Sequence, residues 1–261
     1  MKKRAIIFLT WGENFAAEVE SCLALSTGIE DYDCFLITDD ATQIRNDRLK
    51  VIRARFRLDG YLRKTELPDY LPDGYDSFLF LDSDTRVLAD PVLGFEKAEQ
   101  FGMALAPAPH YSLDCFWGFD KVMKAENVEC RGQLQYNTGV IFFRRSPEVA
   151  AVFERWRELG KRYNRECNLD QPLLTLAMEQ LALNPYTLSI SYNYRGFGEA
   201  ISGIVRIWHS HGPMPENINQ FEKPWPPRRA IPGEVIRPSA GKDKVSGWRN
   251  SVNALLKKLD M

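Results

Sequence analysis

The sequence has almost no net charge and no long apolar run. Its 34 basic and 35 acidic side chains leave a formal net charge of -1. Nucleic-acid binders gain much of their affinity by neutralising phosphates, so this balance argues against such a partner, although a local pocket for a small anion stays open. No stretch reaches the ~18 consecutive apolar residues of a membrane span. If the protein works at a membrane, we expect it to bind from one side.

Cysteine is also scarce, and the cysteines follow no metal-binding or disulfide pattern. Their number is odd, and no two have the CxxC spacing of a zinc or redox site. They are Cys22, Cys34, Cys115, Cys130 and Cys167. The pattern favours packed, reduced thiols in a cytoplasmic protein. The start, "MKKRAIIFLTWGENF", has too short an apolar run for a signal peptide and is better interpreted as a first strand.

The first half of the chain alternates buried strands with helical patterns. The expected strands are "AIIFLT", "CFLIT", "LKVIRA", "SFLFLD" and "GMALAP". Helical spacing covers residues 13–27, and residues 62–71 form a shorter helix. This alternation predicts an α/β fold with a mostly parallel sheet, whose ligands lie outside the carboxyl ends of the strands.

The second half is less regular. We expect strands at "TGVIFF" and "GIVRIW", and helices over residues 146–163 and 169–183. We therefore expect one domain over residues 1–212 and an extension over 213–261. The extension is rich in proline and ends in an amphipathic, partly basic helix. That helix either docks on the domain or lies at the inner face of a membrane or on a partner.

The chemistry begins at "FLFLDSD", where a buried strand ends in two carboxylates. Asp82 and Asp84 have the i, i+2 spacing that lets two side chains point the same way. Two neighbouring carboxylates repel each other unless a cation lies between them. A hard divalent cation such as Mg²⁺ or Mn²⁺ satisfies both. Taken alone, the pair also fits a solvated turn, but the apolar strand before it favours a metal site.

Two of the three histidines stand close together after the last expected strand, in "VRIWHSHG". His209 and His211 are two residues apart, which suits metal ligands or phosphate contacts. An imidazole that joins two carboxylates shifts the preference from Mg²⁺ toward Mn²⁺.

Two further motifs place polar side chains beside elements of the expected sheet. In "YNTGVIFF", Asn137 can hydrogen-bond a hydroxyl-rich ligand, and Gly139 permits close backbone approach. A tight turn before a strand is the alternative. In "NLDQPLL", Asp170 and Gln171 stand in the first turn of a helix. The helix dipole is enough to explain Asp170 but not Gln171.

In this order, "FLFLDSDTRVLADP", "YNTGVIFFRRSP", "NLDQPLL" and "HSHG" resemble the GT-A-fold, metal-dependent glycosyltransferases. The likeness is greatest to the glycogenin and galactosyltransferase-type family 8 enzymes and covers about residues 5–211. It implies a Rossmann-like GT-A domain and transfer of a sugar from a nucleotide-diphosphate donor to a carbohydrate or lipid-linked acceptor, with a UDP-sugar as the expected donor. It also implies retention of configuration at the sugar carbon.

The resemblance assigns metal ligands. Asp84 matches the carboxylate that binds the metal directly, and Asp82 matches the one that binds the metal or the ribose side. Ser83 fills the small position between them. His209 matches the late metal-binding histidine of the family, with His211 as a further candidate. The implied cofactor is Mn²⁺ or Mg²⁺.

The resemblance also assigns donor contacts and catalytic candidates. Thr10, Trp11 and Asp39 match positions that hold the nucleoside, and Lys64 matches a basic residue before the DxD strand. Lys223, in a "KPW" that stands later than in the family, is a second candidate for the phosphates. The catalytic candidates, which match sugar-side and acceptor-side motifs, are Asn137, Asp170 and Gln171.

Two other functions remain open from the sequence. A haloacid-dehalogenase-type phosphatase also has a DxD after an apolar strand, but it normally carries Thr or Val where this chain has Arg86. A catalytically inactive module that binds nucleotide-sugars is the other alternative, and the complete set of Asp82, Asp84 and His209 argues against it.

Overall fold

The structure is a computed structural model that describes residues 2–115, 119–129, 132–163, 169–196, 203–212, 214 and 218, without the side chains of 109–111 and 115. The predictions for Lys223, for the C-terminal helix and for most of the proline-rich extension lie outside these residues, as do Cys130, Cys167 and the side chain of Cys115. Cys22 and Cys34 are buried free thiols, and burial raises the pKa of each to about 11.

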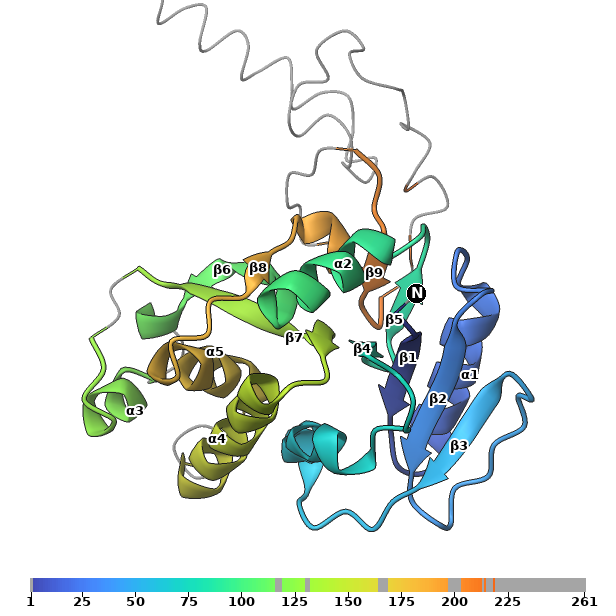
Figure 1. The fold of residues 1–261 in the computed structure, drawn as a ribbon, viewed down its shortest axis with the longest axis horizontal. Helices are drawn as coiled ribbons and strands as arrows, with labels where there is room; N and C mark the ends of the chain where they lie inside the picture. Colours follow the sequence, from blue (N-terminus) through green and yellow to red (C-terminus); the bar gives the residue numbers. More distant parts are fainter. Residues whose placement is uncertain are drawn as a thin grey trace, which may run out of the picture.

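Strands and helices alternate through the first half, as the sequence predicts (Figure 1). The strands are β1 Arg4–Leu9, β2 Asp33–Thr38, β3 Leu49–Arg53, β4 Ser77–Leu81, β5 Thr85–Val87, β6 Met103–Ser112, β7 Leu134–Arg144, β8 Tyr186–Thr187 and β9 Ile207–His209. The α-helices are α1 Glu13–Leu25, α2 Val92–Phe101, α3 Asp120–Ala125, α4 Pro147–Tyr163 and α5 Asp170–Gln180. The 3-10 helices are η1 Gly60–Tyr70, η2 Leu113–Cys115 and η3 Ile190–Tyr192.

Seven strands form the main sheet, in the order β3-β2-β1-β4-β7-β6-β8. Strands β3, β2, β1 and β4 are mutually parallel, and β6 is parallel to β8. Strand β7 runs antiparallel to both of its neighbours, β4 and β6. The prediction of a mostly parallel sheet is therefore confirmed. The reversal of β7 brings its first residues to the edge where β1, β2 and β4 end.

Alternate residues of the central strands face two separate cores. In β4, Phe78 and Phe80 pack in the core that contains Trp156 of α4, whereas Leu79 and Leu81 pack in the core that contains Phe95 of α2. Figure 1 shows α4 and α5 below the sheet and α2 above it. Because both faces are covered, the central strands are continuously apolar, and ligands reach the sheet only at its edges.

The last strand is shorter than predicted and joins a second sheet. "GIVRIW" was expected to form a strand, but β9 covers only Ile207–His209 and pairs antiparallel with β5. This two-stranded sheet stands beside the carboxyl end of β4. Packing then continues past residue 212, where Met214 and Ile218 contact a cluster that includes Trp208.

Candidate functional site

The carboxylate pair stands in a turn that the backbone fixes at the end of β4. The amide N–H of Asp82 donates to the carbonyl of Gly139 on β7 over 2.8 Å. The hydroxyl of Thr85 donates to the carbonyl of Asp82 over 2.7 Å, which closes the turn. Asp82 and Asp84 are thus held at the exit of a buried strand, as the sequence predicts.

Strand β9 carries His209 to the carboxylates. Its pairing with β5 places His209 opposite Thr85, and the amide of Ser210 donates to the carbonyl of Asp84 over 3.0 Å. His209 Nε2 lies 3.3 Å from Asp84 Oδ1 and 3.8 Å from Asp82 Oδ2. Two segments more than a hundred residues apart in the sequence therefore meet at one point.

His211 stands at the rim of this cluster. Its side chain is 71% exposed, against 6% for His209. Its Nε2 lies 3.6 Å from Asp84 Oδ2, and its Nδ1 lies 3.9 Å from Glu18 Oε1 on α1. Between the two histidines that the sequence left as ligands, His209 has the enclosed position.

The donor atoms of Asp82, Asp84 and His209 fit a divalent cation. One ligand atom from each residue lies within 4.8 Å of the other two. Two carboxylates and one imidazole suit Mn²⁺, and Mg²⁺ less well. The imidazole packs against Gly139, where an added Cβ would lie 2.1 Å from His209 Cε1. Gly139 thus permits the close approach that its sequence position predicts, and the group that approaches is the imidazole.

Lys64 links this cluster to α5. Its Nζ lies 2.8 Å from Asp82 Oδ1 and 2.9 Å from Asp170 Oδ2. Burial lowers the pKa of Lys64, but the charges of Asp170 and Asp82 outweigh it and raise that pKa above its usual value. A buried cation between two carboxylates keeps them together in the absence of a ligand.

The two carboxylates of the pair have different electrostatic surroundings. Burial raises the pKa of Asp82 above its usual value, although Lys64 and His209 act in the opposite direction. Burial also raises the pKa of Asp84, but the interaction with a charged, doubly protonated His209 imidazole outweighs this and brings the pKa to about 2. Asp84 is therefore ionised at neutral pH and available to a cation.

The catalytic candidates lie close together on β7 and α5, in two sets of hydrogen bonds. Asn137 Nδ2 donates to Gln171 Oε1 over 3.1 Å. The hydroxyl of Thr138 donates to Asp170 Oδ2 over 2.9 Å. Because β7 and α5 pack against each other, side chains from both elements lie beside Lys64. The structure thus brings Asn137, Asp170 and Gln171 together, next to the carboxylate pair.

A cavity of about 350 Å³ opens beside the pair. Its lining includes Leu9, Thr10, Trp11, Phe15, Gly60, Tyr61, Lys64, Asp82, Ser83, Asp84 and His211. The guanidinium of Arg63 stacks on Trp11 with 4.3 Å between its carbon and the ring centroid. Thr10 Oγ1 is buried without a hydrogen-bond partner among the described residues. Thr10, Trp11, Lys64 and Ser83 therefore share one space with the carboxylates.

Asp39 stands outside that lining. Its carboxylate accepts hydrogen bonds from the amide of Gly12, over 3.1 Å, and from the amides of Ala41 and Thr42. Burial raises the pKa of Asp39, but the hydrogen bonds from Thr42 and Gly12 outweigh it, so the pKa lies below its usual value. In this structure Asp39 shapes the loop that carries Trp11.

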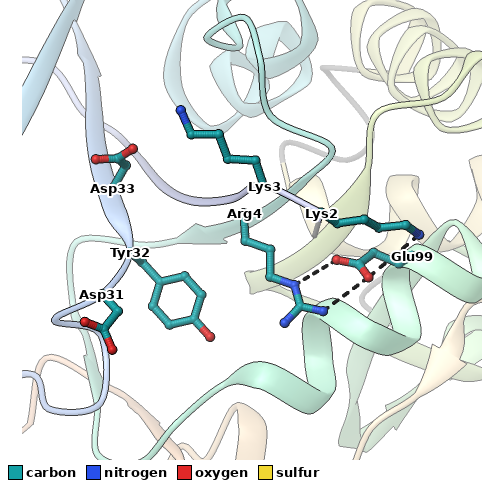
Figure 2. A pocket seen from close by; sticks show the side chains of 7 residues that line it. All are labelled: Lys2, Lys3, Arg4, Asp31, Tyr32, Asp33 and Glu99. Carbon is teal, nitrogen blue, oxygen red and sulfur yellow. Dashed lines mark hydrogen bonds and ion pairs between the residues drawn. The ribbon is translucent and has the colours of Figure 1, made fainter.

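A larger cavity, of about 590 Å³, lies at the opposite edge of the sheet, where β1 and β2 begin. Figure 2 shows Arg4 reaching Glu99, with Nε 2.8 Å from Oε1, while Lys2 approaches the same carboxylate at 3.7 Å. Nearby, Asp33 is paired with Lys50. Among the described residues that line this cavity, no group of metal-ligating side chains gathers as it does at Asp82.

Sequence reasoning missed several polar residues around the site. Asn193 Oδ1 lies 2.7 Å from His209 Nδ1, and Gln171 Nε2 donates to Gln135 Oε1 over 2.8 Å. Ser83 donates its hydroxyl to Glu18 over 2.7 Å. The "YN" of Asn193 stands in no recognisable motif, and Glu18 is one of several charges on α1. Only the three-dimensional structure connects them to the site.

No family model and no curated protein matches the sequence. Solved structures do match. The galactosyltransferase LgtC, in complex with donor and acceptor sugar analogues, is 16% identical with a TM-score of 0.56, over 80% of this chain and 87% of LgtC. An active-site mutant of LgtC is 15% identical with a TM-score of 0.57, over 80% of this chain and 88% of that one.

A further match is mouse xyloside xylosyltransferase 1, 12% identical with a TM-score of 0.52, over 82% of this chain and all of that chain. The glycosyltransferase GlyE of Streptococcus pneumoniae TIGR4 is 16% identical with a TM-score of 0.55, over 85% of this chain and 57% of GlyE. At such low identities the likeness concerns the fold. The sheet order, the reversed β7 and these matches together show that the chain has the fold of the GT-A glycosyltransferases.

Proposed function

We propose that the protein is a metal-dependent glycosyltransferase. It moves a sugar from a nucleotide-diphosphate sugar, a UDP-sugar by its resemblance to family 8, to a hydroxyl of a glycan or glycolipid acceptor. By the same resemblance, the configuration at the sugar carbon is retained. The fold is shared with known glycosyltransferases, while the donor, the metal and the stereochemistry are our proposals.

One observation carries the proposal. The ligand atoms of Asp82, Asp84 and His209 lie within 4.8 Å of one another at the carboxyl edge of a GT-A sheet, and a cavity opens directly beside them. Ligands of open α/β sheets bind at this edge. A bound divalent cation would supply charge neutralisation for the diphosphate leaving group.

The walls of the cavity suit a nucleotide. Trp11 and Tyr61 present aromatic surface to a base, and Thr10, whose buried hydroxyl has no hydrogen-bond partner among the described residues, lies in the same wall. Ser83 and Asp82 stand between this wall and the cation ligands. We propose that Asp39 supports the nucleoside through the loop of Trp11, to which it is hydrogen-bonded at Gly12.

The residues around Lys64 suit the transfer step. Its ammonium stands between Asp82 and Asp170, where it offsets negative charge that develops on the departing diphosphate. The carboxylate of Asp170 stabilises positive charge on the sugar carbon, as carboxylates do in glycosidases. Asn137 holds the amide of Gln171 in place beside it. Lys223 is proposed, from the resemblance alone, as a second phosphate contact.

Two rival functions make different predictions. A haloacid-dehalogenase-type phosphatase would use Asp82 as its nucleophile and hydrolyse simple phosphate esters, and Arg86, where that class carries Thr or Val, argues against it. An inactive module would bind the donor without turnover. The complete set of Asp82, Asp84 and His209 favours an enzyme.

The test is a panel of UDP-, GDP- and CMP-sugars, incubated with the protein and either Mn²⁺ or EDTA, with release of free nucleotide as the readout. We expect slow hydrolysis of one donor that depends on Mn²⁺ and stops with EDTA. Hydrolysis of p-nitrophenyl phosphate without donor turnover would support the phosphatase instead. Donor binding without turnover, in the presence of any acceptor that binds, would support the inactive module.

A further inference from the structure

The imidazole of His209 is held, on the side away from the carboxylates, by the side-chain amide of Asn193, which no sequence motif predicted. Nε2 faces the two carboxylates, and Nδ1 lies 2.7 Å from Oδ1 of Asn193. Both residues are buried, so water does not compete for Nδ1. A neutral imidazole carries its proton on one nitrogen only, and the partner of Nδ1 decides which.

The orientation of Asn193 follows from a donor that cannot be reversed. The backbone N–H of Gly139 donates to Asn137 Oδ1 over 2.8 Å. Asn193 approaches the same oxygen over 2.8 Å and must therefore present its NH₂ group there. Its oxygen then faces His209. Since that oxygen only accepts, Nδ1 of His209 must carry the hydrogen.

The hydrogen bond that Asn137 donates to Gln171 agrees with this orientation of the amides. With its oxygen committed to Gly139 and Asn193, its NH₂ group faces Gln171 Oε1 over 3.1 Å. The NH₂ group of Gln171 then reaches Gln135 over 2.8 Å. Each side-chain NH₂ group in this chain faces an oxygen of the next side chain, so no two donors face each other. The chain ends at Gln135, whose Nε2 has no hydrogen-bond partner among the described residues, so its orientation is fixed from the end at the backbone N–H of Gly139.

We propose that Asn193 is a positioning residue that holds His209 as the Nδ1-protonated tautomer, so that the lone pair of Nε2 faces Asp82 and Asp84. The proposal rests on the metal site of the proposed function and adds a residue to it. In the other tautomer Nε2–H would point at Asp84 Oδ1, 3.3 Å away, and would close the site to a cation. Outer hydrogen bonds select the tautomer of metal-binding histidines in this way.

A purely structural role for Asn193 makes a different prediction. Its amide satisfies two buried partners, so its removal costs stability whether or not a cation binds. Such a role leaves the tautomer of His209 unchanged. The position of the imidazole proton therefore separates the two roles without any measurement of activity.

The experiment uses protein labelled with ¹⁵N at histidine and free of metal, at a pH well above the imidazole reference value of ~6.5. Long-range ¹H–¹⁵N spectra report which ring nitrogen carries the proton, and His209→Gln assigns the signals. We expect Nδ1–H in the natural chain. Nε2–H in that chain would overturn the proposal without any variant at Asn193.

Three variants extend the test. Asn193→Ala should shift the proton to Nε2 and weaken Mn²⁺ binding by about 10- to 100-fold. Asn193→Asp keeps an acceptor at Nδ1 but loses the donor to Asn137 Oδ1, so it should keep the Nδ1–H tautomer and lose less affinity than Asn193→Ala, at a cost in stability. Thr175→Val is the control, because Thr175 is a buried polar residue whose hydroxyl bonds backbone groups of Tyr136 and Gln171 rather than the side-chain amides of the chain.

The outcomes separate the inference from the proposed function. If the natural chain shows Nδ1–H but binds no Mn²⁺, the proposed metal site fails and the positioning role has no cation to serve. If the natural chain binds Mn²⁺ and Asn193→Ala keeps both Nδ1–H and full affinity, the positioning role is wrong and the metal site stands.

Discussion

Gly139 and His209 are the tightest pair of residues in the site. The imidazole lies so close to Gly139 that a Cβ there would stand 2.1 Å from Cε1 and 2.6 Å from Nε2. A side chain at this position must push the ring out of its place, because real atoms do not approach so closely. The position of the His209 imidazole therefore requires a glycine at residue 139, in "YNTG".

We predict that Gly139→Ala weakens Mn²⁺ binding by about 10- to 100-fold, since the displaced ring no longer aims Nε2 at the carboxylates. Gly94→Ala is the matched control. Its Cβ would crowd the ring of Phe142 at 2.4 Å, on the side of the sheet that α2 covers. Both variants should lose stability, by about 1–3 kcal/mol. Only Gly139→Ala should lose metal affinity in a calorimetric titration, and equal affinities would refute the packing argument.

Asp84 is the carboxylate best prepared for a cation, with a pKa of about 2. We predict that Asp84→Asn reduces Mn²⁺-dependent nucleotide release by more than ~100-fold. This loss exceeds the one expected on mutation of a residue that only hydrogen-bonds to a metal ligand. The fold should persist, because the amide keeps the shape of the side chain. Asp40→Asn, at an exposed carboxylate that lines no part of the cavity, should leave release unchanged. Global unfolding of Asp84→Asn would mean that the pair is structural.

At the scale of elements, residue pattern and apolar runs predict much of what positions the site. Strands β1, β2 and β4 are continuous apolar runs, and the aspartates that follow β2 and β4 mark their exits. Because parallel strands end at one edge, Asp82 could be placed beside Thr10 from sequence alone. The strong amphipathic helix α4 was also predicted within one residue of its bounds.

The pairing that completes the site has no such signal. Strand β5 has three residues, too few for a periodic pattern. The strand expected at "GIVRIW" exists only as the short β9, and its pairing with β5 joins segments far apart in the sequence. Asn193 follows the short helix η3 and reaches the site only because β9 returns beside β5. Tertiary pairing decides such contacts, and a single sequence does not record it.

Glu126, at the end of α3, ties that helix to α4 and α5. Its carboxylate binds Arg155 and Arg162 at 2.6 Å each, and it accepts hydrogen bonds from Tyr163 and Gln180. Burial raises the pKa of Glu126, but the hydrogen bonds from Tyr163 and Gln180 outweigh it, and the pKa falls from 4.5 to about 2. The folded state therefore prefers the ionised form.

A pKa lowered on folding contributes stability above the unfolded-state value and loses it as the pH falls through the folded-state value. We therefore predict that Glu126→Gln lowers the free energy of unfolding at neutral pH. The deficit should shrink as the pH falls from 4.5 toward about 2. Denaturant titrations across this range measure it, with Glu154→Gln, exposed on α4, as the control. A deficit that does not change with pH would contradict the ionic account.

At the scale of the whole molecule, the metal ligands and the cavity lie within residues 9–211, and packing of the described chain reaches Ile218. None of the described helices has the length and apolar character to cross a membrane. We propose that residues 219–261 contribute to acceptor choice, apart from Lys223, for which we propose a contact with the donor.

Removal of residues 219–261 tests this division. The variant keeps Met214 and Ile218, which pack in the cluster of Trp208, so we predict a folded protein with unchanged Mn²⁺ affinity. It lacks Lys223, and the proposed phosphate contact predicts a higher KM for the donor. Lys223→Ala in the full chain should reproduce that increase. An unchanged KM in both variants would remove Lys223 from the donor site.

The central claim is that Asp82, Asp84 and His209 hold a divalent cation against a nucleotide diphosphate. The most direct measurement is a crystal structure of the protein with Mn²⁺ and UDP, with anomalous diffraction to locate the metal. The account predicts an anomalous peak bonded to Asp84 and to His209 Nε2, with the diphosphate completing the coordination. A peak elsewhere, or UDP bound without a metal at these residues, would contradict it.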